Sequence, residues 1–382
     1  MHKSFIVAVI CDSTSITPKY LKKRFSTFNN DLIRFKDWLL ENDCNNVCME
    51  YTGKYYVPVY NALENDISNV VVANPKWVKA IKGEKDDNKD AKWIADLFKM
   101  GLVRSSYIPS KDFRVLREFT RYRYKLTNTK SSEKNRFTNA LTVGNCKLDM
   151  VFSDIFGKSS QSIIDIILNN DNFSDEDIIS CLRKNCKSSP ENILSSIDGI
   201  QLTNEQKLRI TIVKDHIDYL INQIDKLNNI IDILVKPYKS SIDLLCTIPG
   251  IDRNSAIGVL SEISNDMSQF KSHYRLASWA GLAPGCNESA GKKKSVKISK
   301  RRGKKRAIIA IARKILVAIY HMFETGEVWN PIDLASVETP IEDRIRYTKN
   351  NFNQSFKQLL SLGLTSEELI DLINQNANKL PV

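Results

Sequence analysis

Short apolar segments and one helical pattern alternate over about the first hundred residues. Residues 5–10, 47–49 and 70–73 are rich in β-branched side chains and are bounded by polar positions. Such segments are typical of strands buried in a sheet that helices cover. Residues 27–40 have the spacing of a helix. The pattern therefore predicts an α/β domain at the start of the chain.

A long helical pattern follows in the middle of the chain. Residues 111 to about 147 are helical in pattern and strongly basic. Farther on, apolar residues alternate steps of three and four over more than three heptads, which is typical of a coiled-coil helix. This stripe consists of Ile210, Val213, Ile217, Leu220, Ile224, Leu227, Ile231 and Leu234. Pro237 predicts the end of the helix, because proline has no backbone N–H. The stripe must pack either on residues 111–145 of the same chain or on another subunit, and the sequence leaves both possibilities open.

The remaining segments are predicted to be mainly helical. Residues 150–206 are polar and poor in glycine, and we expect a small helical segment there. Two further helices are predicted at about residues 254–263 and 307–323. The tail beyond Pro331 is polar.

The charge of the chain points to a polyanionic partner. The formal net charge is +12 over 382 residues, and residues 292–306 contain ten Lys or Arg and no acid. Because basic side chains release counterions when they neutralise phosphates, such clusters favour nucleic-acid binding over a merely solvated surface. The candidate phosphate contacts are Arg117, Arg121, Arg123, Lys292, Lys293, Lys294, Lys297, Lys300, Arg301 and Arg302.

Other classes of protein fit the composition less well. No apolar run approaches the roughly 20 residues that cross a bilayer, and the start lacks the layout of a secretory signal. We therefore expect a cytoplasmic protein without a membrane partner. Eight cysteines are too dilute over this length for a disulfide scaffold, and their spacings match no zinc module. Reduced thiols in the core are expected.

Three carboxylates form a candidate metal site. Glu50 directly follows a predicted strand, and Asp87 and Asp90 are three residues apart near the start of a predicted helix over residues 92–100. On the first turn of a helix this spacing places both aspartates on one face. An acidic helix start alone is explained more simply by capping and the helix dipole. Combined with the strand-end glutamate, however, it predicts oxygen ligands for Mg²⁺, which Mn²⁺ can replace.

A serine in the basic loop is a candidate nucleophile. Ser289 lies close to Gly291 and Lys292, and contact with a phosphate without chemistry is the simpler interpretation. As a nucleophile it would attack a phosphodiester, and the neighbouring cations would stabilise the alkoxide and the developing charge. No histidine is nearby in sequence. A metal-bound hydroxide or a carboxylate from the other domain would have to take the proton.

The segment over residues 247–251, before a predicted helix, resembles a helix-hairpin-helix turn. The backbone N–H groups of such a turn can bind DNA phosphates without reading sequence. A tight turn between packed helices is the alternative.

Taken together, these segments resemble DEDD-type transposases of the insertion sequence one-ten family, which also includes the Piv-type DNA invertases. The likeness runs from residue 1 to about residue 325. The motifs that carry it are Met49-Glu50-Tyr51-Thr52-Gly53, Lys85 to Ala91, residues 116–123, residues 247–251, Ser278 to Leu282, and Ser289-Ala290-Gly291-Lys292.

The resemblance implies a fold that is α/β plus α. The implied parts are an RNase H-like (RuvC-like) metal-binding domain over residues 1–108, a basic helix and coiled-coil linker over 109–240, a mainly helical transposase domain with the helix-hairpin-helix-like turn over 241–325, and a polar tail over 326–382. It further implies that Glu50, Asp87 and Asp90 hold Mg²⁺ and that Ser289 becomes covalently bonded to the cleaved strand. The implied partners are double-stranded DNA at the element ends and target, a structured guide RNA from the element, and further copies of the chain in a dimer or tetramer.

The printed sequence departs from the family pattern at two places. The family's first carboxylate is the Asp of a G-x-D-x-H-K motif that ends its first strand, and Met1 falls just after it. We therefore expect either a start codon farther upstream or a truncated copy; Asp12 matches the loop beyond the family's second strand. The family's glycine-asparagine pair is Gly303-Lys304 here. The leading prediction is a DNA recombinase, and the alternatives are a RuvC-like nuclease without a covalent intermediate and an inactive nucleic-acid-binding remnant.

Overall fold

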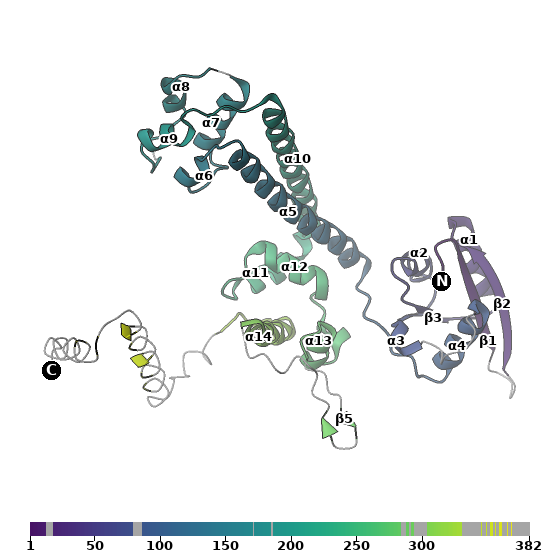
Figure 1. The fold of residues 1–382 in the computed structure, drawn as a ribbon. Helices are drawn as coiled ribbons and strands as arrows, with labels where there is room; N and C mark the ends of the chain where they lie inside the picture. The colour runs from purple at the N-terminus through teal and green to yellow at the C-terminus, as the bar shows by residue number, and fades with distance from the viewer. Residues whose placement is uncertain are drawn as a thin grey trace. The chain divides into compact units, whose positions relative to one another are not determined.

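The structure, a computed structural model, is mostly helical with short strands. It describes residues 1–12, 18–78, 86–170, 172–184, 186–283, 288–289, 292–293 and 304–330, with single positions beyond residue 344. The chain divides into two compact units (Figure 1). The first comprises Met1–Lys239 and Asn254–Ser272, and the second comprises Ser240–Arg253 and His273–Val382.

Four strands of the first unit form two small sheets. β1 (Phe5–Asp12) pairs antiparallel with β2 (Lys19–Ser26), and β3 (Asn46–Glu50) runs parallel to β4 (Asn69–Ala73). Within the described ranges, no ladder joins one sheet to the other. Strands β1, β3 and β4 confirm the predicted apolar segments. No apolar run marks β2, because most of its side chains are exposed, as is typical of an edge strand rich in lysine.

Helices α1 (Asn29–Glu41) and α2 (Tyr56–Leu63) share one apolar core with these strands. In each helix the buried residues follow one another in steps of three and then four, which is the spacing of one helix face. The rings of Phe25 and Phe35 lie 5.1 Å apart in a tilted arrangement that aromatic pairs favour. The buried members of this core are Ile6, Ile10, Phe25, Leu32, Phe35, Leu39, Met49, Tyr56, Val59, Leu63, Ile67 and Val72.

Two helices follow β4, the short α3 (Pro75–Val78) and α4 (Asp87–Lys99). Helix α4 packs against β1 and β3. The hydroxyl of Tyr20 on β2 donates a hydrogen bond of 2.6 Å to Asp96 of α4. This bond stabilises the neutral phenol and raises the pKa of Tyr20 to about 12. Helix α4 is therefore held to the edge strand β2 by this bond, and to β1 and β3 by packing.

The two longest helices pack along each other and form what we call the arm (Figure 1). They are α5 (Lys111–Val143) and α10 (Asn204–Leu234). Thr203 begins α10 with a capping box that includes Gln206, and the helix ends before a 3-10 turn, η1 (Lys236–Tyr238), that contains Pro237. Most of the predicted heptad stripe is buried. Because α5 is the helix that packs along α10, the structure supports packing of this stripe within the chain.

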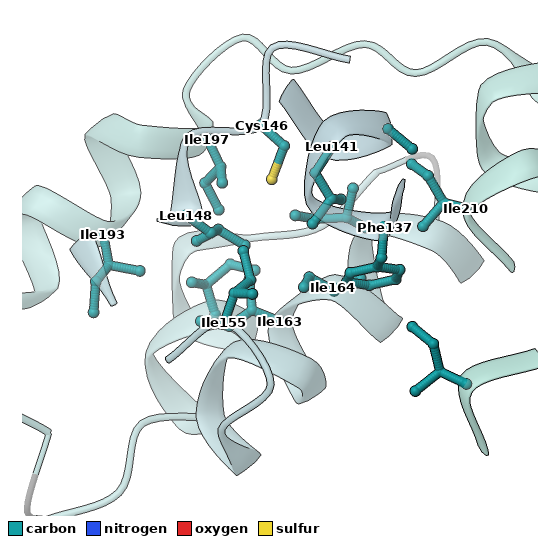
Figure 2. Packing of buried hydrophobic residues seen from close by; sticks show 14 residues of the cluster. Phe137, Leu141, Cys146, Leu148, Ile155, Ile163, Ile164, Ile193, Ile197 and Ile210 are labelled. Atoms are coloured by element: carbon teal, nitrogen blue, oxygen red, sulfur yellow. The ribbon is translucent and has the colours of Figure 1, made fainter. Parts of the chain in front are cut away.

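Four short helices connect the outer ends of the arm. They are α6 (Leu148–Val151), α7 (Lys158–Asn169), α8 (Asp175–Ser180) and α9 (Pro190–Ile197). Their apolar side chains meet those of α5 and α10 in a core that we call the tip cluster (Figure 2). Its buried members are Phe137, Ala140, Leu141, Cys146, Leu148, Ile155, Ile163, Ile164, Ile167, Ile178, Ile193, Ile197, Ile210 and Ile217. The helical segment expected between residues 150 and 206 is therefore confirmed.

Gly144 lies against Leu202 where the tip cluster joins α5. A Cβ atom at Gly144 would lie 2.2 Å from Cδ2 of Leu202, so the end of the Leu202 side chain would have to move. Gly144 follows the last residue of α5, so the missing side chain allows the segment before α10 to approach the end of α5 closely.

The first unit also contains α12 (Arg253–Ile263) and a 3-10 turn, η2 (Met267–Phe270). Helix α12 confirms the helix predicted at about residues 254–263. Ser264 follows α12 with a φ angle of 58°, and Lys271 follows η2 with a φ angle of 55°. These positive φ angles end both helical segments.

The second unit is built from α11 (Lys239–Cys246), α13 (His273–Trp279) and α14 (Lys304–Thr325). Helices α13 and α14 pack against each other. A small antiparallel hairpin, β5 (Glu288–Ser289) with β6 (Lys292–Lys293), lies between them in sequence. None of the helices that the structure describes is both long and apolar enough to span a membrane.

A type II turn follows α11, and its residue types explain it. Ile251 donates its backbone N–H to the carbonyl oxygen of Ile248 at 3.0 Å. Pro249 takes the first central position, where its fixed φ fits, and Gly250 takes the second with φ of 85°. The turn predicted over residues 247–251 is present, and its role in phosphate binding stays a prediction.

Replacing Phe137 by alanine should destabilise the tip cluster by about 3–5 kcal/mol, because a fully buried ring would leave a cavity. Hydrogen exchange of the amides of α7 in the whole chain measures the change. Phe28→Ala is the matched control: this side chain is 79% exposed, and its loss should change stability by no more than about 0.5 kcal/mol. Equal effects of the two substitutions would contradict the packing described here.

Candidate functional site

Glu50 is the last residue of β3 and is half-buried. Its Cα is the register partner of Ala73 on β4, and the next residue, Tyr51, donates its N–H to the Ala73 carbonyl at 2.8 Å. Successive side chains of a strand point to opposite faces. Since Met49 belongs to the core beneath α1 and α2, Glu50 lies on the other face of β3.

The environment of Glu50 along the strand is partly dry. Cys48 lies two residues earlier and therefore on the same face. Burial raises the pKa of its thiol to about 11.

Asp87 and Asp90 lie on the first turn of α4, as their spacing predicts. The helix begins earlier than the sequence pattern suggests, because the side chain of Asp86 caps it by accepting a hydrogen bond of 3.0 Å from the N–H of Asn88. Asp87 and Asp90 are both exposed, whereas Asp86 is half-buried. The cap and the acidic pair are thus different residues, which leaves the carboxylates of the pair outside the capping bond.

A shallow hollow of about 460 Å³ lies at the start of α4. It is lined by Phe5, Val7, Arg24, Asp86, Asp87 and Asn88. The guanidinium carbon of Arg24 lies 3.8 Å from the ring centroid of Phe5, in cation–π contact. Phe5 and Val7 alternate with the core residue Ile6, so the hollow opens on the face of β1 that is turned away from the core.

The three predicted carboxylates lie on elements that contact each other, but they do not form a cluster. Glu50 lies on β3, and the two aspartates lie on α4, which touches β3 and β1. Among the residues that the structure describes, no group of three or more Asp, Glu, His or Cys is close enough to hold a metal ion. Oxygen donors of the type that Mg²⁺ prefers are present, but they do not converge.

Ser289 lies in the hairpin of the second unit. Its Cα is the register partner of Lys292, and Glu288 is opposite Lys293. The backbone therefore places the serine directly across from a lysine. Five further basic residues predicted to contact phosphates lie outside the described residues, namely Lys294, Lys297, Lys300, Arg301 and Arg302.

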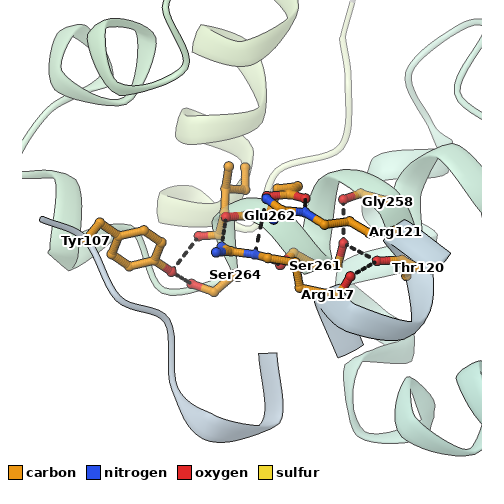
Figure 3. A network of polar contacts seen from close by, with 9 residues as sticks. Tyr107, Arg117, Thr120, Arg121, Gly258, Ser261, Glu262 and Ser264 are labelled. Atoms are coloured by element: carbon orange, nitrogen blue, oxygen red, sulfur yellow. Dashed lines mark hydrogen bonds and ion pairs between the residues drawn. The ribbon is translucent and has the colours of Figure 1, made fainter. Parts of the chain in front are cut away.

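The predicted basic residues of α5 have partners within the protein (Figure 3). Arg117 donates from Nε to the carbonyl oxygen of Ser261 at 3.2 Å and from Nη2 to that of Glu262 at 2.6 Å. These carbonyls belong to the last turn of α12, where no basic residue of the helix itself is present. A half-buried guanidinium at this end balances the partial negative charge of the helix terminus.

Neighbouring residues extend this network along α5 and α12. Arg121 binds the carboxylate of Glu262 with two parallel hydrogen bonds of 2.7 and 2.8 Å. Thr120 donates to the hydroxyl of Ser261 at 3.0 Å, and both side chains are buried. Tyr107 donates to Ser264 at 3.1 Å. The network joins the start of the arm to the end of α12.

Electrostatics differ between the two arginines. Burial lowers the pKa of Arg117, although the carboxylate of Glu262 opposes this effect. The hydrogen bonds to Glu262 raise the pKa of Arg121, which is more exposed. Arg123 donates to Asn254 at 2.8 Å and to Asn228 of α10 at 3.3 Å. All three guanidinium groups are therefore engaged in contacts that sequence reasoning did not anticipate.

Sequence signals for this network exist, but they are weak. Arg117, Thr120 and Arg121 follow the three-and-four spacing of one helix face, which indicates a common partner. Ser261 and Glu262 end a helix without a basic last turn. Neither pattern identifies the segment that its residues contact, because the two segments are more than 140 positions apart in sequence.

Two family models match the two segments that carry these groups. A DEDD transposase model of the IS110 type matches residues 1–144, and the model described as the transposase IS116/IS110/IS902 family matches residues 242–323. The chain belongs to the IS110 family of transposases. The first match contains Glu50 and the acidic pair of this transposase, and the second contains Ser289. None of the curated proteins compared with the transposase matches it.

Membership in the family has direct consequences for the transposase. It indicates DNA transposition as the activity, DNA as a partner, and an RNase H-like fold for the first match. DEDD transposase domains typically use a divalent metal ion. The strand-end glutamate and the acidic first turn of α4 lie in the domain to which that use applies.

Arg117→Ala should loosen the end of α12 in the transposase, because two helix-terminal carbonyls and Glu262 would lose a half-buried donor. A cost of about 1–3 kcal/mol corresponds to hydrogen exchange in the last turn of α12 that is about 5–150 times faster. Arg34→Ala is the control. Arg34 pairs with Asp31 at 3.0 Å, but its side chain is 75% exposed, so its loss should have little effect. Unchanged exchange in α12 would show that the network does not hold the helix.

Proposed function

We propose that this transposase cuts and rejoins DNA through a serine nucleophile assisted by Mg²⁺-binding carboxylates and guided by an RNA from its element. The observation that carries the proposal is the pairing of two matched segments, one with the acidic groups on β3 and α4, the other with Ser289 opposite Lys292. A hydrolytic nuclease would need the first segment alone.

Glu50, Asp87 and Asp90 are the residues that would hold Mg²⁺, with Mn²⁺ able to replace it. Bound Mg²⁺ would stabilise the charge on the attacking and leaving oxygens of the phosphoryl transfer. Because the described carboxylates do not converge, the proposal requires Glu50 to come within reach of the aspartates when the ion binds. It is supported by the contact between β3 and α4, the two elements that carry them.

Ser289 would attack the scissile phosphate through Oγ. The Oγ–P bond forms and the bond from phosphorus to one deoxyribose oxygen breaks. The proton of the serine passes to a carboxylate of the acidic domain, and the departing oxygen takes a proton from water and leaves as a DNA hydroxyl. The cationic loop around Lys292 favours the charge that develops on the phosphate oxygens. Rejoining is the reverse step, in which a DNA hydroxyl attacks the phosphoserine and releases Ser289.

The partners in this proposal are double-stranded DNA at the element ends and target, the guide RNA, and other copies of the chain in a dimer or tetramer. The basic loop from Lys292 to Arg302 is the main proposed phosphate contact. Arg117, Arg121 and Arg123 would have to exchange internal partners for phosphates, so we assign them a smaller share of the phosphate contacts. The turn after α11 is a further proposed contact through its backbone.

A covalent adduct is the decisive observable. The transposase, mixed with DNA carrying the element ends, Mg²⁺ and the flanking RNA, should give a labelled protein–DNA species that survives denaturation. Ser289→Ala should abolish it, because no other nucleophile is assigned, and Ser295→Ala in the same basic loop should retain it. Equal adduct in both variants would refute the serine assignment.

The same assay separates the acidic site from folding defects and from the rival functions. Glu50→Gln should abolish the adduct while leaving DNA binding intact, and Asp218→Asn, an exposed carboxylate of α10, should change neither. Cleavage without adduct would identify a nuclease in which water attacks. Binding without cleavage, even in Mn²⁺, would identify a nucleic-acid-binding remnant.

Replacing both Lys292 and Lys293 by glutamine should reduce the salt dependence of DNA binding. Each lost phosphate contact lowers the slope of log K against log salt by about 0.9, so a change of about 2 is expected. The matched control is Lys36→Gln combined with Lys214→Gln, because these amines pair with Asp66 and Asp165 within the protein. Binding measured by fluorescence anisotropy over a salt series gives both slopes. Identical slopes would remove the hairpin from the interface.

A further inference from the structure

Helix α10 carries a second apolar stripe that the arm does not cover. The stripe consists of Leu208, Ile212, Tyr219, Ile230 and Ile233, with exposed fractions of 62%, 58%, 60%, 39% and 63%. Their separations of four, seven, eleven and three residues keep them on one side of a helix with 3.6 residues per turn. This side is distinct from the buried stripe, which begins at Ile210 and packs on α5. Large apolar side chains in a line on an exposed helix mark an interaction surface.

Two opposite charges lie within the same stripe. Asp215 is three residues after Ile212, and Lys226 is seven residues after Tyr219, so both share the stripe's side of the helix. Both are exposed. They are eleven residues apart, a rise of about 16 Å along the helix, and cannot pair with each other in one chain. In the described part of the structure, neither has an ion partner.

We infer that the stripe binds the same stripe of a second copy of this chain, with the two α10 helices antiparallel. A two-fold axis midway between positions 220 and 221 would place Leu208 opposite Ile233 of the second copy. The same axis would place Asp215 opposite Lys226 of the second copy, and symmetry repeats each contact. The apolar ends and the opposite charges therefore match in a single register.

Charge decides the direction of the pairing. A parallel pair in register would put the two Asp215 carboxylates together and the two Lys226 amines together, which is repulsive at both places. Antiparallel pairing converts both contacts into attractions. Tyr219 would lie next to the two-fold axis, where an aromatic residue at the centre of an interface contributes most to binding.

The stripe is long enough for a specific contact. From Leu208 to Ile233 it extends over about 38 Å of helix, and four of its five apolar residues are more than half exposed. The inference specifies the surface behind the oligomer in the proposed function. It does not depend on cleavage or on bound nucleic acid, so the two can fail separately.

Charge exchange tests the pairing in the full chain without DNA. The variants D215K and K226D should each weaken the dimer by about tenfold or more, because each replaces two attractions by two repulsions. An equal mixture of the two variants should dimerise again, since one chain then carries two lysines on the stripe and the other two aspartates. The double variant D215K/K226D should dimerise like the original protein. Sedimentation velocity over a concentration series measures all four.

An apolar substitution provides the second arm of the test. Ile233→Ser should weaken the dimer, whereas Ile221→Ser should not, because Ile221 is 39% exposed on another side of the same helix. Far-ultraviolet circular dichroism should be unchanged for every variant, since all four positions are exposed. A chain that is monomeric at all concentrations would overturn the inference. An oligomer that no variant changes would also overturn it, and would place the association of subunits on a different surface while leaving the proposed recombination reaction untouched.

Discussion

Packing of one apolar face of α10 along α5 is the constraint on which the rest of the first unit depends. Isolated helices are marginal in water, even when they are long. Here each helix stabilises the other, because residues such as Ile217, Leu220 and Ile224 leave water when they meet α5. The arm then holds other elements in place. Its outer end completes the tip cluster through Phe137 and Ile210, and its inner end holds α12 through Arg117.

The network at Arg117 shows that basic residues in this chain serve two purposes. Some balance a helix terminus and a half-buried carboxylate, as Arg117 and Arg121 do between α5 and α12. Others belong to residues 292–306, a segment whose sequence contains no acid. The net charge of +12 counts both kinds equally. A basic residue that already pairs within the protein contributes less to counterion release when phosphates bind.

Local patterns predicted much of this fold, and long-range contacts account for what they missed. Apolar runs identified β1, β3 and β4, and the three-and-four spacing identified α10. Strand β2 was not recognisable, because its lysines face water and its pairing with β1 is a tertiary property. The heptad stripe could not reveal whether α5 or another subunit covers it, because both offer the same apolar surface.

The candidate site was predictable in the same partial way. Glu50 at a strand end and Asp87 on a first helical turn follow from short-range sequence, and the structure places both as expected. Their distance from one another depends on how α4 packs on β1 and β3, which no local pattern encodes. The contact between Arg117 and α12 was likewise invisible, since each partner alone resembles an ordinary solvated helix position.

The continuity of α5 gives the arm a mechanical property. This helix has 33 residues without interruption, which is a rod of about 50 Å. One end is embedded in the tip cluster, where Phe137 is fully buried, and the other end is held to α12 by Arg117. A rod that is clamped at both ends bends little, so a force on the tip cluster would reach α12 as a tilt or rotation of the whole arm.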